Sequence, residues 1–317
     1  MVLSAINLAA LDPLKLLRSM PGGVAQGILW GIMALGVYVT FKVLSVSDLT
    51  VEGSFATGGA VAVMLIIHGK PAWLAVLAAA CAGILCGTVT GLLHTMLGIP
   101  AILAGILTQL ALYSVNLRIM GMAANQAVSV DKYKLILSSR HVPHAILTGA
   151  IIAAVIIGVM YWYFGTEQGS AIRATGNNPE MSKAQGINID SMKVLGFAIS
   201  NGIVAFAGGL LAQYQGFADV NMGRGASVIG LAAVIIGEVI ASALFKGSLN
   251  FAVRLLFVIL GGIAYYAVVI LVLWLKLNTN DLKLFTAVIV AVFLAVPYLR
   301  QQRKSSFAAR KGDGKNA

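Results

Sequence analysis

Long apolar segments, separated by short polar connections, dominate the pattern of hydrophobic and polar positions along the chain. Each segment is close to the roughly 20 residues that a helix needs to cross a bilayer. Unpaired backbone groups are too costly in lipid for isolated strands, so each segment is expected to be a helix. The pattern predicts nine spans, within a range of eight to ten, at 24–44, 50–68, 72–97, 101–119, 145–164, 193–214, 226–245, 251–275 and 281–299.

Two of these segments depart from a uniform apolar helix. The segment at 50–68 opens on the polar, glycine-rich run TVEGSFATGG, so a broken or re-entrant helix is the alternative to a full span. The segment at 101–119 follows Gly98-Ile99-Pro100, and a partial span is the alternative there.

The composition indicates which solvent surrounds this fold. The chain is 59% hydrophobic and 10% charged, whereas a soluble domain carries about 25% charged residues. Lipid is therefore the expected solvent, and we expect an all-α, multi-pass helix bundle forming one membrane domain over 1–300. A weak sequence repeat adds to this expectation, because 57–73 and 228–249 share a pattern and would have opposite orientations, as in inverted-repeat transporters.

The net charge of +11 does not indicate a nucleic-acid partner. Six of the 22 lysines and arginines lie between 300 and 315, and all of them except Arg300 belong to a tail (301–317) that we expect to be disordered. Basic residues beside spans mark the cytoplasmic side and contact anionic lipid headgroups. The first 23 residues lack the pattern of a signal peptide, and we expect an interfacial segment there.

The polar stretch at 165–192 is the most unusual connection in the chain, because it is far longer than a turn between spans requires. It predicts a short helix over 177–185, with Pro179 and Glu180 in the first turn and Gly186 at the end. Four spans separate it from the basic tail, which places it in the cytoplasm and the N-terminus outside. If 50–68 is re-entrant, the N-terminus lies inside instead.

Polar side chains inside the apolar segments are the candidate lining of a solute path. Glu238 is the clearest case, since apolar residues flank it on both sides. The alternative is structural hydrogen bonding between helices. The candidates are Asp48, Glu52, Thr57, Thr108, Gln109, Asn201, Glu238 and Ser242, and further hydrogen-bonding groups are Asn116, Gln213 and Gln215.

Several other chemistries are disfavoured by the sequence. It has no GxxxxGK[ST] phosphate loop, no metal-binding His or Cys spacing and no GxSxG motif, so we expect no ATPase site, metal site or catalytic set in this chain. Cys81 and Cys86 are interpreted as small apolar residues. Gly83, Gly87 and Gly91 predict close helix packing, within the bundle or at a dimer interface.

The run from Gly169 to Phe217 carries a family resemblance. It is similar to the central region of permease subunits of bacterial ATP-binding-cassette importers, in the branched-chain amino acid and ribose permease group. In that group a short cytoplasmic coupling helix precedes a GIN-type turn and a span with paired small residues. The matching positions are Arg173, Ala174, Gly176, Asn177, Pro179, Ala184, Gly186, Ile187, Asn188 and Ala207-Gly208-Gly209.

Two further segments refine the resemblance, which covers most of 24–299. Residues 43–63 resemble the second span of the group, and LTVEGSF and IIGEVI are most similar to a subgroup associated with tryptophan/tyrosine-type or uncharacterised solutes. Branched-chain amino acid permeases carry a different, INFAHG-like stretch around 45–53. The chain also begins one span later than ribose-type members, which favours an external N-terminus.

The resemblance implies a transport subunit in the bacterial cytoplasmic (inner) membrane that moves a small, amino-acid-like solute by alternating access. A second permease copy, ATPase subunits that bind the ATP and an extracytoplasmic solute-binding protein would be its partners. The residues that would contact the ATPase are Arg173, Gly176, Asn177, Pro179, Glu180, Ala184, Gly186 and Ile187.

Two alternatives from other classes stay open at the level of sequence. One is an ion- or proton-coupled secondary transporter in which Glu238 is the carrier. The other is a membrane-embedded enzyme, which the missing catalytic set disfavours.

Overall fold

The computed structural model describes residues 13–245 and 249–274, with single positions between 284 and 295. The predicted span at 281–299 lies almost wholly outside these ranges, and the basic tail at 301–317 lies outside them altogether. Eight helices in the described part are long and apolar enough to cross a membrane. The prediction of an all-α, multi-pass bundle is therefore confirmed, and eight of the nine predicted spans have a matching helix.

The long helices follow the predicted segments closely, and two short helices and two short strands occupy the connections. The long helices are α1 (Pro13–Tyr38, continued by the π-helical turn η3, Val39–Val43), α2 (Thr50–Ile67), α3 (Ala72–Thr95), α4 (Ala101–Ile119), α5 (Val142–Gly165), α8 (Ile189–Gln215), α9 (Ala226–Leu244) and α10 (Phe251–Trp274). The short helices are α6 (Glu167–Asn177) and α7 (Pro179–Ala184), and the antiparallel strands are β1 (Asn125–Ala127) and β2 (Phe217–Asp219).

Helix α8 forms the centre of one half of the bundle, where it packs against α1, α2 and α3. The predicted glycine stripe on α3 faces α8. A Cβ on Gly83 would overlap the backbone of Asn201, and one on Gly91 would press on Val194. Close backbone approach of this kind replaces the hydrophobic drive that is absent between helices in lipid. These glycines therefore pack the chain against itself, which was one of the two predicted uses.

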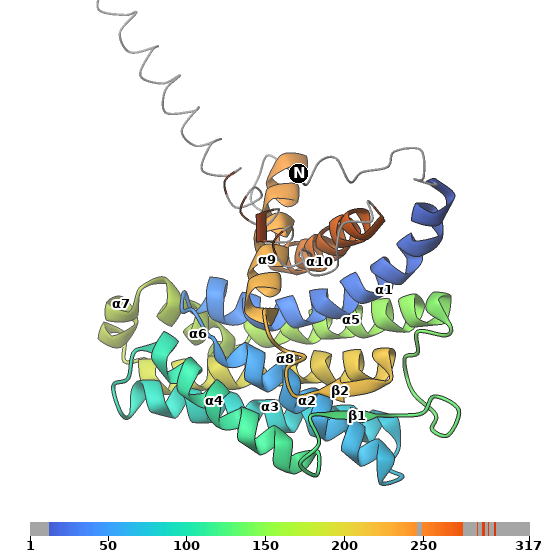
Figure 1. Ribbon diagram of the computed structural model, residues 1–317. Coiled ribbons are helices and arrows are strands. Elements are labelled where there is room, and N and C mark those ends of the chain that lie inside the picture. Colours follow the sequence, from blue (N-terminus) through green and yellow to red (C-terminus); the bar gives the residue numbers. More distant parts are fainter. Residues whose placement is uncertain are drawn as a thin grey trace, which may run out of the picture.

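Helix α1 lies between this half and the pair α9 and α10 (Figure 1). Gly27 and Gly31 of α1 allow the backbone of α10 to approach at Ile263 and Ile259. Since residues 27 and 31 meet 263 and 259 in reverse order, α1 and α10 are antiparallel. The same helix α1 thus holds both halves of the bundle together.

The bundle has two distinct ends (Figure 1). Helix α1 ends beside Gly176 of α6, so α6 and α7 lie at the end where α1 finishes, and Pro13 lies toward the opposite end. The β1–β2 ribbon follows the last residues of α4 and α8 at that opposite end. Neither α2 nor α4 is interrupted, so five long helices precede α6, as the parity argument requires.

Helices α2 and α9 begin close to each other and run in opposite directions. The backbone N–H of Gly225, the residue before α9, donates to Oε1 of Glu52 in the first turn of α2 at 3.1 Å. From there α2 runs toward the ribbon end, whereas α9 runs toward η3, where Glu238 forms an ion pair with Lys42. These opposite directions are the ones that an inverted pair of segments requires.

The first helix is longer than predicted. Its span was expected to begin at 24, but α1 is continuous from Pro13 and contains Pro21. Pro21-Gly22-Gly23 reads as a helix breaker, although proline is tolerated in membrane helices where neighbours satisfy the freed backbone group. Gly23 contacts the Ile270 side chain of α10. Residues 13–23 therefore belong to the first long helix, and residues 1–12 lie outside the described part.

Candidate functional site

The polar connection between α5 and α8 is built from three consecutive side-chain caps. Thr166 Oγ1 accepts from the N–H of Gly169 at the start of α6, at 3.3 Å. Asn178 Oδ1 accepts from Met181 at the start of α7, and Asn188 Oδ1 accepts from Ser191 at the start of α8, both at 3.1 Å. Each cap satisfies a backbone donor that a helix start would otherwise leave unpaired.

Helix α7 also has a defined end. Gly186 adopts a φ of +81°, and the N–H groups of Gly186 and Ile187 donate to the carbonyls of Lys183 and Ser182. This is the pattern of a glycine-terminated helix. The predicted stop at Gly186 is thus confirmed.

The predicted start of this helix, however, was wrong. The helix was expected over 177–185, but Asn177 is the last residue of α6 and α7 begins at Pro179. Asn177 and Asn178 are both possible N-cap residues. Proline favours the first position of a helix, so the cap is the residue directly before Pro179, which is Asn178. The signal was present in the sequence and was assigned to the wrong neighbour.

Helix α7 projects from the bundle, whereas α6 is fixed to it. Met181 of α7 is 61% exposed, whereas Ile172 of α6 is fully buried. A Cβ on Gly176 would overlap the carbonyl of Val43 in η3, so α6 contacts the end of α1 through its backbone. Of the residues predicted for ATPase contact, Gly176 and Ile187 are half-buried, and the exposed ones are Arg173, Asn177, Pro179, Glu180, Ala184 and Gly186.

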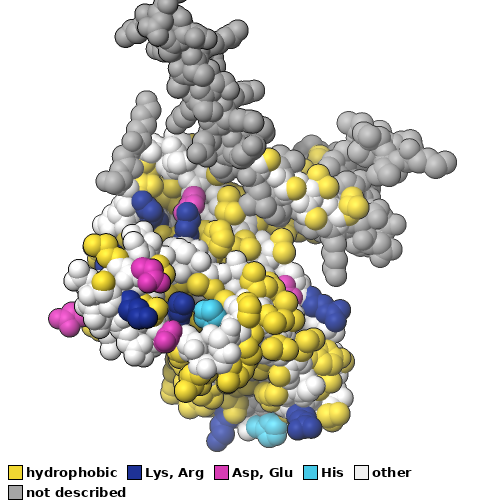
Figure 2. Space-filling view, turned by 90° about the vertical axis from the view of Figure 1, so that its left-hand side faces the viewer, with side chains coloured by type: hydrophobic (Ala, Val, Ile, Leu, Met, Phe, Trp, Pro, Cys, Tyr) yellow, Lys and Arg dark blue, Asp and Glu magenta, His cyan; other side chains and the backbone are white. Residues whose placement is uncertain are grey.

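Seen from the α6–α7 end, charged side chains of both signs gather on one part of the molecule, beside a broad hydrophobic surface (Figure 2). The hydrophobic surface has the composition that lipid requires, and the charged part has the composition of a surface in contact with water. This end therefore presents a polar platform at the edge of the bundle.

Two of the predicted path residues, Asp48 and Asn201, form a buried cluster instead of an open lining. Asn201 Nδ2 donates to Asp48 Oδ2 at 2.7 Å, and Ser54 Oγ donates to Asn201 Oδ1 at 2.7 Å. The N–H of Thr50 donates to Asp48 Oδ1 at 2.8 Å. Burial raises the pKa of the Asp48 carboxyl, and the hydrogen bonds from Thr50 and Asn201 act in the opposite direction. The cluster ties the start of α2 to α8.

Hydroxyl groups extend these contacts to α3 and α4. Thr90 Oγ1 donates to Thr108 Oγ1 at 2.9 Å and lies 2.8 Å from Thr50 Oγ1. Thr57 Oγ1 donates within its own helix to the carbonyl of Gly53. Thr57 and Thr108 are buried, so the structure favours the structural interpretation for both.

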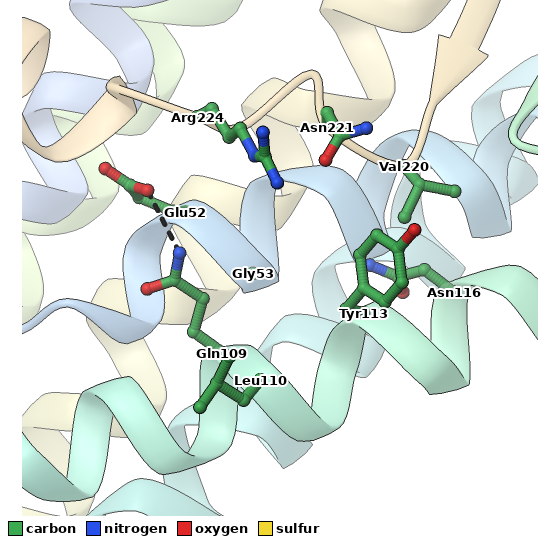
Figure 3. Close-up of a pocket in the computed structure, with 9 residues that line it drawn as sticks. All are labelled: Glu52, Gly53, Gln109, Leu110, Tyr113, Asn116, Val220, Asn221 and Arg224. Carbon is green, nitrogen blue, oxygen red and sulfur yellow. Dashed lines mark hydrogen bonds between the residues drawn. The ribbon is translucent and has the colours of Figure 1, made fainter.

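Two other predicted residues, Glu52 and Gln109, share a cavity of about 250 Å³ between α2, α4 and the connection from β2 to α9 (Figure 3). Gln109 Nε2 donates to Glu52 Oε2 at 3.0 Å. The sequence had named Asn116 as a hydrogen-bonding group, but gave no signal for Tyr113, Asn221 or Arg224. The lining is Glu52, Gly53, Gln109, Leu110, Tyr113, Asn116, Val220, Asn221 and Arg224.

Glu238 and Ser242 lie elsewhere. Glu238 Oε2 is 3.0 Å from Lys42 Nζ. It follows Gly225 by 13 residues, which places it about 20 Å along α9 from the cavity at about 1.5 Å per residue. Ser242 is exposed and donates to the carbonyl of Val239 in its own helix. The predicted path residues are thus distributed over three places.

Comparison with known proteins decides the family. The family described as "Branched-chain amino acid transport system / permease component" matches residues 19–297. The chain belongs to this permease family. It is 35% identical over 285 residues, 90% of this chain and 93% of the relative, to a tyrosine transport system permease protein of Clostridioides difficile. It is 30% identical over 273 residues, 85% of this chain and 94% of the relative, to an uncharacterised protein of Rickettsia prowazekii.

A more distant relative carries a different solute in its name. The permease is 25% identical over 235 residues, 71% of this chain and 60% of the relative, to a fructose import permease of Rhizobium meliloti. No solved structure matches the chain. Family and spans together make this chain a multi-pass permease subunit of an ATP-binding-cassette importer in the inner membrane, as the resemblance implied.

In this permease, two regions with different chemistry lie apart. The capped, exposed helix α7 is joined to α8 at one end of the bundle, and α6 beside it contacts η3. A polar cavity with charged residues lies where α2 and α9 begin. The first suits contact with another protein, and the second suits contact with a small polar solute.

Proposed function

We propose that this permease imports an amino-acid-like solute and is driven by ATPase subunits that contact α6 and α7. The observation that carries the proposal is the construction of α7, which is capped at both ends, exposed, and continuous through Asn188 with the central helix α8. Force applied to α7 would reach α8 through that cap, and would reach α1 where Gly176 meets Val43.

The permease family supports the choice of partners, and the arrangement of the helices suggests where each would dock. The ATPase subunits, which bind the ATP, would dock at the α6–α7 end on the cytoplasmic side. An extracytoplasmic solute-binding protein would dock at the β1–β2 end, with the N-terminus of the chain on that outer side. A second permease copy would complete the assembly, with membrane lipid around it. Arg173, Glu180 and the other exposed residues of the predicted set would contact the ATPase.

The transport step would be a change between two packings of the bundle. The close glycine contacts of α3 with α8 and of α1 with α10 make these pairs move as units. The clusters around Asp48 and Thr90 would hold α2, α3, α4 and α8 together during this movement.

The solute class rests on the cavity and on the relatives. One relative is named for tyrosine transport, and the cavity beside α2 and α4 contains both a carboxylate and a guanidinium group. An amino acid carries the two complementary charges, whereas a sugar such as fructose carries neither.

A charge placed on α7 tests the proposed ATPase contact. Met181→Asp puts a carboxylate on an exposed position of α7, and loss of an interface anchor costs about 2 kcal/mol or more, roughly thirtyfold in affinity. We expect the ATPase subunits to co-purify with the wild-type chain and to be lost from this variant.

The matched control is Met122→Asp, at the opposite end of the bundle. Met122 is 73% exposed and has a φ of +64°, which aspartate tolerates better than most residues. This variant should retain the ATPase. If Met181→Asp retained it as well, while folding normally, α7 would not be the contact.

A further inference from the structure

The cavity between α2, α4 and the β2–α9 connection contains two opposite charges that do not pair with each other. Among the described residues, no carboxylate lies within ion-pair distance of Arg224. Glu52 accepts one hydrogen bond on each oxygen, from Gln109 and from the backbone of Gly225, and both donors are neutral. Opposite charges in one cavity would ordinarily be expected to pair.

A third polar group in the same cavity lacks a partner. Asn116 is 1% exposed, and its Oδ1 has no hydrogen-bond partner among the residues that the structure describes. A buried amide oxygen without a donor costs about 1–3 kcal/mol. Asn116 lies two turns along α4 from Gln109, and Figure 3 shows it behind the ring of Tyr113. An occupant with an N–H donor would satisfy it.

The position of the cavity fits a point on a solute path. Glu52 precedes the end of α2 at Ile67 by 15 residues, about 22 Å at about 1.5 Å per residue, whereas Asn116 is one turn from the end of α4. The cavity therefore extends from near the β1–β2 end into the interior of the bundle. Its volume of about 250 Å³ is close to the lower end of the range of about 300–1,000 Å³ that small-molecule sites occupy, which suits one small solute.

We propose that this cavity is a recognition site for the zwitterionic group of an α-amino acid. Arg224 binds the carboxylate and Glu52 binds the ammonium group. Asn116 Oδ1, two turns along α4 from Gln109, accepts a hydrogen bond from a donor on the side chain of the solute. The guanidinium group presents a planar pair of donors that matches a carboxylate. Tyr113, which is 45% exposed, offers an aromatic face to the side chain of the solute.

This site deepens the proposed function and rests on it, because it names the part of the solute that the permease itself recognises. The binding protein would select the solute before delivery, and the cavity would be a second point of selection inside the bundle. A neutral solute of the same size would leave both charges without a counter-charge, which would weaken its binding.

The test uses the permease assembled with its ATPase subunits in nanodiscs, without the binding protein, and radiolabelled L-tyrosine and L-leucine as probes. The wild type should bind at least one probe. Tyramine, which lacks the carboxylate, and 3-(4-hydroxyphenyl)propionate, which lacks the ammonium group, should compete with L-tyrosine about tenfold more weakly or worse. This comparison needs no variant, so misfolding does not affect it.

Three variants test the role of each side chain in binding the solute. Arg224→Gln, Glu52→Gln and Asn116→Leu should each weaken binding about tenfold or more, and Arg224→Lys should restore part of it. Arg118→Gln is the matched control, since Arg118 is exposed at the end of α4 and does not line the cavity. Co-elution with the ATPase shows that a variant has folded, and Glu52→Asp and Arg224→Lys decide if the glutamine variants do not assemble.

Two results would overturn the proposal. One is a wild type that binds neither probe, and the other is undiminished binding by Arg224→Gln and Glu52→Gln. ATP-driven uptake in the presence of the binding protein separates this failure from failure of the proposed function. If L-tyrosine or L-leucine is imported but the cavity variants import it at the wild-type rate, the site is wrong and the transport function stands.

Discussion

Single side chains set the geometry of both regions. Asn178 and Asn188 begin α7 and α8, and Gly176 allows α6 to lie against η3. Inside the bundle, the hydrogen bond from Asn201 to Asp48 also has a structural role, because a buried carboxylate needs hydrogen-bond donors. These residues are polar or small for local structural reasons, and their placement decides which surfaces remain available for partners and solute.

The Asp48–Asn201 contact makes a prediction at this scale. Asn201→Leu removes one donor from a buried carboxylate, and a hydrogen bond to a charged group contributes about 1.5–3 kcal/mol. We expect the Tm of the purified permease in detergent to fall by several degrees. Ser242→Ala, which removes an exposed hydroxyl that bonds within its own helix, should leave the Tm unchanged. Equal Tm values for the two variants would contradict the structural role of the cluster.

The bounds of some helices could be predicted from the sequence, and those of others could not. Long apolar segments predicted the spans because bilayer thickness fixes helix length, and Gly186 predicted the end of α7 because few residues adopt its φ. Pro21 was misjudged because neighbouring helices, which a sequence does not show, can accommodate proline in a membrane helix. The start of α7 was misplaced by two residues because Asn177 and Asn178 are equally good caps in isolation.

The two adjacent asparagines give a sharp test of α7. Asn178→Ala should cost its helix about 1 kcal/mol and speed backbone hydrogen exchange over 180–184. Asn177→Ala is the matched control and should leave exchange there unchanged, since Asn177 ends α6 and does not cap α7. The opposite result, with faster exchange only in Asn177→Ala, would show that the helix begins where the sequence first suggested.

The whole molecule combines what was predictable with what was not. Glu52 and Gln109 could be named from the sequence because ionisable and amide groups in apolar segments are rare. Arg224, which lines the same cavity, could not, because it lies in a polar connection where arginine is ordinary, and only the fold brings that connection beside α2 and α4. The sequence also could not show that Glu238 lies far from the cavity, because that distance depends on where α9 packs in the bundle.

The central claim is that ATP hydrolysis by partner subunits drives import through this chain. The most direct measurement is uptake of L-tyrosine and L-leucine by proteoliposomes that contain the permease, its ATPase subunits and its binding protein. We predict uptake that requires ATP, continues when the proton gradient is collapsed, and survives Glu238→Gln. Uptake without ATP that stops when the proton gradient is collapsed, or in Glu238→Gln, would contradict the account and favour a proton-coupled carrier.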